Sequence, residues 1–278
     1  MMMVLLALLL VLQPSLGSNE GDENALKFLH KFGYLSMSRS GNQNVNKALK
    51  MYQEFMGLPV TGVLDKATQE EMKKPRCGLP DIVDGSTRLR RYSTYGKWWR
   101  TDLKYYIQFG KDLYEKDQVR IFAESFNRWS KVAPRLKFTR TMDPKNADFK
   151  ISFGYNEHFG VPGEKKCSSK FDGWNGVLAH AYMPSDGRIH FDEKEWWSAY
   201  ENHGLFKQPL PQVATHEIGH ALGLRHSKVK GSMMWPSCCE STATLHQDDI
   251  DGIRKLYGMT VSMRRELTSI NEGFAPVT

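Results

Sequence analysis

The sequence has only four cysteines in 278 residues and, beyond its first residues, no apolar run of membrane-spanning length. Four cysteines are too few for a disulfide-dense scaffold, so apolar burial must build the core. The net charge of +7 comes from 38 basic and 31 acidic residues and lacks the concentrated basic stripe of a nucleic-acid-binding protein. There is also no internal repeat and no low-complexity tract. These absences leave an ordinary globular protein of one large or two smaller domains.

The longest apolar run is at the N-terminus. Met3–Leu12 is uninterrupted, but it is shorter than the about 20 residues that a transmembrane helix needs. Small residues follow at Ser15 and Gly17, in the spacing that a signal peptidase recognises, so we expect a signal peptide over residues 1–17. A buried helix is the alternative. A signal peptide predicts a secreted, extracellular product without a membrane anchor.

Residues 18–91 have the pattern of a small helical bundle. Between residues 24 and 75, apolar side chains recur at steps of three and four, the period of amphipathic helices. A turn containing glycine and proline follows the clearest helix, and Leu64–Met72 forms another. The apolar face of the clearest helix consists of Val45, Ala48, Leu49, Tyr52, Phe55 and Met56.

A basic sequence, Arg88-Leu89-Arg90-Arg91, ends this segment. Its position between two differently built parts of the chain favours cleavage after Arg91 by a processing convertase with an acidic cleft. A solvated charge run in a linker is the alternative.

From Leu103 onward, strands and helices are mixed, which predicts an α/β or α+β domain. The helix at 209–222 carries the most specific motif, His216-Glu217-x-x-His220-x-x-Gly223-x-x-His226. Histidines four apart share a helix face, and Gly223 can turn the chain back to deliver a third imidazole. Three imidazoles and an open position are what a catalytic zinc needs. The other expected elements are strands at 103–109, 147–153, 177–183 and 189–191, and helices at 119–129 and 248–257.

Two further segments support a zinc protease. Residues 232–236, Ser-Met-Met-Trp-Pro, follow the motif as a methionine turn that places Met234 beneath the ligands, and the combination resembles the metzincin class. Residues 75–81, Pro-Arg-Cys-Gly-Leu-Pro-Asp, contain Cys77, whose thiolate could fill the open position on zinc. This segment resembles the cysteine switch of matrix metalloproteinases, the matrixin branch of the metzincins.

The resemblance covers nearly the whole chain and implies a latent zymogen. It implies a metzincin zinc-protease domain at 92–259, with a twisted mixed sheet and long helices, after an all-α propeptide at 18–91. Cys77 would bind zinc, Arg76 would pair with an acidic group, and the mature enzyme would begin at Tyr92. The polar tail at 260–278 then predicts a minimal, matrilysin-like, monomeric protein without a hemopexin-like domain.

The same resemblance assigns the chemistry. Glu217 would be the general base that takes a proton from the attacking water and returns it to the leaving amine. Substrate would lie extended along the sheet edge at 178–182 and add a strand through main-chain hydrogen bonds. The residues expected to contact substrate are Leu178, Ala179, Ala181, Gln212 and Pro236.

The metal ligands beyond the catalytic zinc depart from the family pattern. A second, structural zinc would use His180 and His190 on strands, but the expected loop ligands fall on Lys165 and Cys167. We therefore favour loss of this zinc, with an improvised site of two imidazoles and one thiolate as the alternative. One calcium site is expected, because Asp172, Asp192 and Glu195 fall where the family has carboxylate ligands. A second calcium loop is shortened, and we expect no site there.

The remaining cysteines are odd in number once Cys77 is assigned to zinc. We hypothesise a disulfide from Cys167 to either Cys238 or Cys239. Cys238 also stands where the family often has a tyrosine in the wall of the specificity pocket, so substrate preference does not transfer.

Two functions of different class fit these features. The first is a secreted zinc endopeptidase acting on extracellular matrix, including collagen, or on a narrower secreted target, with a convertase and tissue-inhibitor-type proteins as partners. The second is a silent matrix-binding protein that holds acidic glycans through Lys165, Lys166 and Lys170. Glu217 and the cysteine segment favour the enzyme, because a binding protein needs neither.

Overall fold

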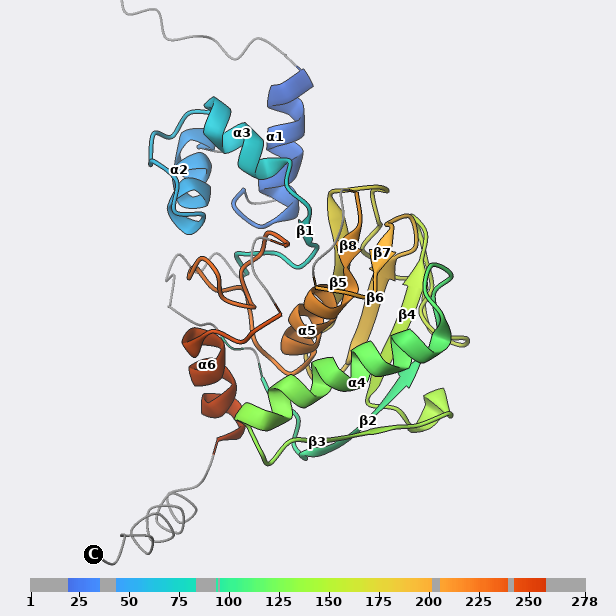
Figure 1. Cartoon of the computed structure of the whole chain (residues 1–278). Coiled ribbons are helices and arrows are strands. Elements are labelled where there is room, and N and C mark those ends of the chain that lie inside the picture. The colour runs from blue at the N-terminus through green and yellow to red at the C-terminus, as the bar shows by residue number, and fades with distance from the viewer. Residues whose placement is uncertain are drawn as a thin grey trace, which may run out of the picture.

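The structure is a computed structural model that shows a small helical module beside a larger body of sheet and helices (Figure 1). We call residues 20–83 the N-terminal module and residues 96–258 the main domain. Several sequence predictions lie outside the described residues: the signal peptide at 1–17, the basic site at Arg88, Arg90 and Arg91, Tyr92, and the tail at 260–278. The residues that the structure describes are 20–35, 44–83, 94, 96–201, 206–239 and 243–258.

Three helices build the N-terminal module, as the apolar periodicity predicted. Asn44 and Asp65 precede two of them, and their side chains accept hydrogen bonds from Lys47 N and Thr68 N, which satisfies amides that the first turns leave free. The helices pack around a core in which Tyr52 is fully buried. The helices are α1 (Glu20–Lys31), α2 (Val45–Phe55) and α3 (Lys66–Met72).

A mixed six-stranded sheet forms the main domain, with the strand order β1-β5-β6-β4-β2-β3. β5 is antiparallel to β6, and the other neighbouring strands are parallel. β1 comes from the N-terminal module and pairs with β5, the edge at which we expected substrate to bind. The strands are β1 (Arg76–Cys77), β2 (Asp102–Ile107), β3 (Lys137–Arg140), β4 (Phe149–Gly154), β5 (Val177–Ala181) and β6 (Arg188–Asp192), with a separate pair, β7 (Trp197–Ser198) and β8 (Gln208–Pro209).

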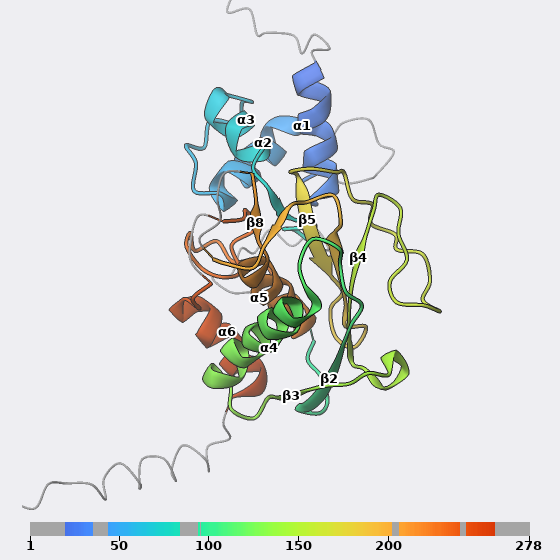
Figure 2. The ribbon, with the colours of Figure 1, turned by 45° about the vertical axis from the view of Figure 1, so that its right-hand side comes forward.

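The helices α4 (Glu115–Val132) and α5 (Leu210–Ala221) lie against one face of the sheet (Figures 1 and 2). Trp129 on α4 is fully buried and donates its indole N–H to Thr215 O on α5 at 2.9 Å. α6 (Gln247–Tyr257) fixes the C-terminal end of α5, because the Tyr257 hydroxyl donates to Leu222 O at 2.8 Å. α5, which carries the histidine motif, is thus held at its middle and at its C-terminal end. No described helix has the length and apolar character that crossing a membrane requires.

Two candidate metal centres

Two groups of four buried side chains could each hold a metal ion, among the residues that the structure describes. In each group, the potential ligand atoms all lie within 4.8 Å of one another. Thiolate and imidazole, the groups that both contain, are ligands that zinc prefers in proteins. The first cluster is Cys77, His216, His220 and His226, and the second cluster is His158, Cys167, His180 and His190.

Helix α5 supplies two histidines of the first cluster from one face. His216 and His220 are one turn apart, and their Nε2 atoms are separated by 3.0 Å. Gly223 takes a φ of +106°, a conformation that glycine adopts without strain, and this turn brings the His226 ring to the same pair. The motif spacing predicted this arrangement, and the three imidazoles do lie together.

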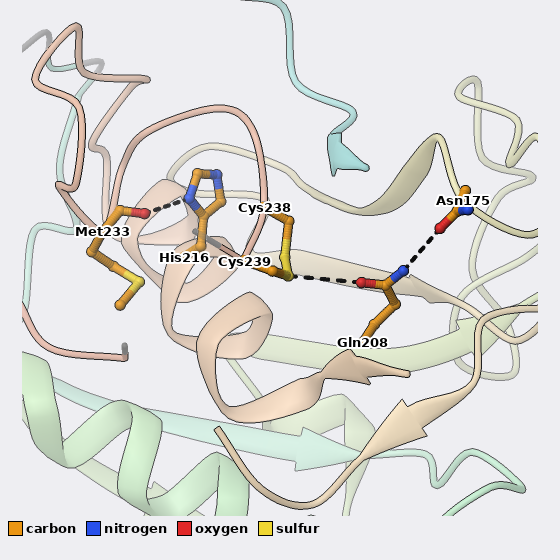
Figure 3. Close-up of a disulfide and its surroundings, with 6 residues drawn as sticks. All are labelled: Asn175, Gln208, His216, Met233, Cys238 and Cys239. Carbon is orange, nitrogen blue, oxygen red and sulfur yellow. Dashed lines mark hydrogen bonds between the residues drawn. A yellow bond between two sulfur atoms is a disulfide. The ribbon is translucent and has the colours of Figure 1, made fainter. Parts of the chain in front are cut away.

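Main-chain carbonyls orient the rings of the two helical histidines. His216 Nδ1 donates to Met233 O at 2.6 Å, as Figure 3 shows, and His220 Nδ1 donates to Leu224 O at 2.7 Å. Each bond leaves Nε2 available as a ligand atom. Burial lowers the pKa of His216 to about 3, which keeps the imidazole in the neutral form that binds metals.

The methionine turn packs beneath these ligands. Met234 is buried, and a Cβ at Gly219 on α5 would lie only 2.5 Å from its sulfur, so glycine is needed for the close approach. Asp249 fixes the turn by accepting hydrogen bonds from Met233 N at 2.8 Å and Met234 N at 3.0 Å. Our sequence analysis placed Asp249 in the first turn of a helix but missed this second role, which depends on a long-range contact.

The N-terminal module delivers Cys77 to the histidines along the open sheet edge. Gly78 N donates to Ala179 O on β5 at 2.8 Å, and Cys77 N donates to Pro236 O on the opposite side at 3.0 Å. Cys238 N in turn donates to Pro75 O at 2.7 Å. The cysteine segment is therefore bonded to the main domain on both sides, in the manner expected of an extended peptide substrate.

Arg76 forms its ion pair within the same segment. Its guanidinium lies 2.6 Å from Asp81 Oδ1, and both side chains are buried. Asp81 also accepts hydrogen bonds from the Tyr34 hydroxyl at 2.9 Å and from His226 Nδ1 at 2.7 Å. Burial opposes ionisation of Asp81, but Arg76 and His226 outweigh it and hold the pKa of Asp81 below its usual value. The acidic partner expected for Arg76 is thus Asp81.

A pocket opens beside the first cluster, next to Glu217. Glu217 is fully buried, and neither carboxylate oxygen has a hydrogen-bond partner among the described residues. Burial raises the pKa of Glu217 to about 8. Three of the expected substrate-contacting residues line the pocket, whereas Ala179 and Ala181 are buried in β5. The three lining residues are Leu178, Gln212 and Pro236.

The cysteine pairing differs from our hypothesis. The disulfide joins the neighbours Cys238 and Cys239, and Cys167 is a free, buried thiol. Cys167 cannot reach this bond because it is packed in the second cluster, where its sulfur lies 3.1 Å from His180 Nε2. Figure 3 shows the disulfide near His216, with Cys239 Sγ 3.7 Å from Gln208 Oε1. Cys238 lines the pocket, as its sequence position predicted.

The second cluster contains a ligand that our sequence analysis missed. His180 on β5 and His190 on β6 occupy paired positions, and the loop before β5 adds both Cys167 and His158. His158 Nε2 lies 3.0 Å from His190 Nδ1, and His180 Nε2 lies 3.2 Å from the same atom. The cluster therefore offers three imidazoles and a thiolate, the four protein ligands that a structural zinc site needs.

Our expectation that the loop lacks a histidine ligand is wrong, because His158 joins Cys167, His180 and His190. We placed the loop histidine at Lys165 by fixed spacing, but the loop folds back on itself, with Phe159 bridged to Lys166. Cys167 N donates to His158 O at 2.8 Å, and this bond brings the two side chains to one side of the loop. A search for any histidine earlier in the loop would have found this ligand.

The three acids expected at a calcium site lie in and near the end of β6. Asp192 is buried and accepts two main-chain N–H bonds, whereas Asp172 pairs with Lys31 of the N-terminal module at 3.2 Å. Burial, together with the charge of Asp192, raises the pKa of Glu195 to about 7. These acids are not among the described groups whose ligand atoms gather within 4.8 Å, so calcium binding stays a prediction.

Comparison with known proteins covers both parts of the chain. The matrixin family model matches residues 97–258, and the model of a putative peptidoglycan binding domain matches residues 21–72. Neutrophil collagenase of Homo sapiens is 40% identical over 235 residues, covering 82% of this chain and 46% of its own length. Interstitial collagenase of Bos taurus is 40% identical over 222 residues, covering 77% of this chain and 43% of its own length.

A plant relative matches over a larger share of its own length. Metalloendoproteinase 1-MMP of Arabidopsis thaliana is 35% identical over 280 residues, covering 92% of this chain and 74% of its own length. The chain spans less than half the length of the two collagenases. The match of the matrixin model to the whole main domain, together with these relatives, shows that the chain belongs to the matrixin family of zinc metalloendopeptidases.

Proposed function

We propose that this protein is a secreted zinc endopeptidase that stays latent until its N-terminal module is removed. The observation that carries the proposal is the first cluster, in which Cys77 joins three histidines beside the buried Glu217. A thiolate in the fourth position leaves no room for a reacting water. Removal of the segment that carries Cys77 would open that position, which is the condition for a catalytic zinc site.

The residues of the first cluster fit zinc, because their Nδ1 atoms are engaged and Nε2 of each remains available. Bound zinc supplies Lewis acidity toward a peptide carbonyl and toward water. Glu217 accepts the proton of the attacking water and returns it to the departing amine nitrogen. Glu217 lines the pocket beside His216, where a general base must lie to reach the attacking water.

The segment that closes the site indicates the kind of substrate. The Cys77 segment is extended and hydrogen-bonded to β5 and to Pro236, so a polypeptide in the same groove would find the same main-chain partners. We therefore propose extracellular proteins as substrates, with matrix proteins and collagen among the candidates that the names of the relatives suggest. Tissue-inhibitor-type proteins and a convertase acting after Arg91 remain proposed partners.

The second cluster fits a structural zinc. All four ligands come from the main domain and are buried, which describes a closed site. A single calcium ion at Asp172, Asp192 and Glu195 is a further proposal, supported by the buried carboxylates of Asp192 and Glu195. The alternative of a glycan-binding protein rests on Lys165, Lys166 and Lys170, of which Lys166 and Lys170 share one acidic partner, Glu157.

The test uses the full chain, untreated or cleaved after Arg91, on a library of quenched peptides. We expect turnover only after cleavage, and we expect Glu217→Ala to lower it by about 10²–10⁴-fold while zinc content is unchanged. A cleaved, zinc-loaded protein that cuts no peptide would overturn the proposal and favour a binding function.

A further inference from the structure

The three histidines of the first cluster differ in what holds their rings. His216 and His220 donate from Nδ1 to carbonyls of the main domain itself. His226 instead donates from Nδ1 to a carboxylate oxygen of Asp81, at 2.7 Å, and Asp81 belongs to the N-terminal module. One of the three rings thus depends for its orientation on the part of the chain that is proposed to leave.

Asp81 is held firmly enough to act on His226. Its side chain is fully buried, Arg76 lies 2.6 Å from Oδ1, and the Tyr34 hydroxyl donates to Oδ2 at 2.9 Å. The carboxylate therefore has partners on both oxygens besides His226. A charged carboxylate acceptor makes a stronger hydrogen bond with an N–H donor than a neutral carbonyl does.

We infer that Asp81 is a positioning residue for His226, so that the N-terminal module acts on the first cluster twice, through Cys77 and through the Asp81–His226 bond. The inference rests on the proposed function, which makes this cluster a zinc site. The bond fixes the His226 ring with Nε2 toward the other ligands and raises its basicity as a ligand. The module is then a metal-retaining element as well as a cover, and its removal loosens one of the three protein ligands that remain.

An alternative role for Asp81 is to pair with Arg76 and shape the cysteine segment. That role predicts that any change at the Arg76–Asp81 pair alters the signals of Cys77 and of all three histidines together. The positioning role predicts a change confined to His226. The two are separable, because Tyr34 and Arg76 bond directly to the Asp81 carboxylate, whereas the described hydrogen bond of the His226 ring is to Asp81.

The experiment uses the zinc-loaded full chain with Glu217→Gln, which prevents self-cleavage. Ring ¹⁵N–¹H spectra are recorded for this protein and for Asp81→Asn, with Tyr34→Phe and Arg76→Lys as matched controls on the same carboxylate. We expect Asp81→Asn to displace the Nδ1–H resonance of His226 and to leave those of His216 and His220 in place. Both controls should keep the His226 resonance near its original position.

Zinc affinity gives a second readout. In competition with a chelator, Asp81→Asn should weaken zinc at the first cluster by about 10–100-fold, the usual cost of losing the hydrogen-bond partner of a ligand. Two zinc ions are expected to be released to the chelator in two steps. The step that His220→Gln removes belongs to the first cluster. The Cys77 thiolate is monitored separately, as the part of the sulfur-to-cobalt charge-transfer band that Cys77→Ser removes, because Cys167 of the second cluster contributes the rest.

Two outcomes would overturn the inference. One is an Asp81→Asn spectrum in which the His226 resonance does not move. The other is a joint shift of all three histidines with loss of the Cys77 part of the thiolate band, in Asp81→Asn and Arg76→Lys alike, which would mean that the segment has undocked. Neither readout needs turnover, so the failure of this inference is distinguishable from the failure of the proposed function, which the peptide assay of the cleaved wild-type chain tests separately.

Discussion

The two clusters use the same kinds of ligand and differ in where the thiolate comes from. In the first cluster, Cys77 belongs to the N-terminal module and reaches histidines on α5 and the following turn. In the second, Cys167 and His158 share one loop and meet two histidines on adjacent strands. One thiolate can leave with a cleaved segment, and the other is part of the domain that remains.

This difference assigns a role to each cluster. A structural zinc site keeps four protein ligands, whereas a catalytic site keeps three and an open position. Of the two clusters, the first can change from four protein ligands to three and an open position when one cleavage removes Cys77. It also borders Glu217 and the pocket. The comparison teaches that ligand type alone does not separate the two roles, and that the origin of each ligand in the chain does.

Replacing one histidine in each cluster should give opposite phenotypes. In the cleaved enzyme, we expect His220→Gln to lower turnover by about 10³-fold or more, because Lewis-acid stabilisation of several kcal/mol is lost. His180→Gln should mainly lower the unfolding temperature, by about 10 °C, since metal binding there would stabilise the fold. Peptide assays measure turnover and thermal melts measure the unfolding temperature of both variants. An equal loss of turnover in the two would contradict the catalytic role of the first cluster and the structural role of the second.

Replacing Cys167 tests the ligand set of the second cluster. Cys167→Ala should lower zinc affinity at this cluster by about 100-fold or more, because it removes the only anionic ligand. Cys167→Asp should keep most of the affinity, since a carboxylate oxygen also binds zinc. Zinc stoichiometry after dialysis against a weak chelator measures both, and two zinc ions retained in Cys167→Ala would show that the thiolate is not a ligand.

Replacing the two thiolates in the uncleaved chain should separate latency from structure. Cys77→Ser offers zinc only a neutral hydroxyl, so we expect activity at least about 10-fold above that of the uncleaved wild type. Cys167→Ser should leave the uncleaved chain latent. Rates on a quenched peptide measure the difference, and a silent Cys77→Ser protein with full zinc content would contradict the role of Cys77.

The smallest expected effect concerns the buried acids near β6. Burial raises the pKa of Glu195 from its ordinary 4.5 to about 7. Between these two pH values the folded protein binds more protons than the unfolded chain, so stability without calcium should fall as pH rises through this window. Calcium or Glu195→Gln should flatten that decline. Denaturant titrations at pH 5 and pH 7.5 measure it, and a decline unaltered by Glu195→Gln would exclude this carboxyl as its cause.

Features carried by local pattern were predictable from the sequence. The helices of the N-terminal module follow apolar periodicity, and the three histidines of the first cluster follow from helical spacing and the turn at Gly223. The family resemblance placed Cys77 on the same cluster. β3 was not predicted, because its half-buried residues show no clear apolar alternation.

Features that depend on how distant segments meet could not be predicted in this way. His158 joins the second cluster only because the loop folds back beside Cys167. The Asp81–His226 bond joins residues 145 positions apart in the chain. The Cys238–Cys239 disulfide was missed because we expected the structural zinc to be lost and a disulfide from Cys167 to replace the stiffening that it provides.

The most direct test of the account is the thiolate absorption of the cobalt-substituted protein before and after cleavage at Arg91. Both cobalt ions should remain when the N-terminal module is removed, while the sulfur-to-cobalt band falls to about half, because Cys77 leaves and Cys167 stays. An unchanged band would mean that Cys77 was never a ligand. Loss of the whole band, or of one cobalt ion, would contradict the division into an opening site and a closed one.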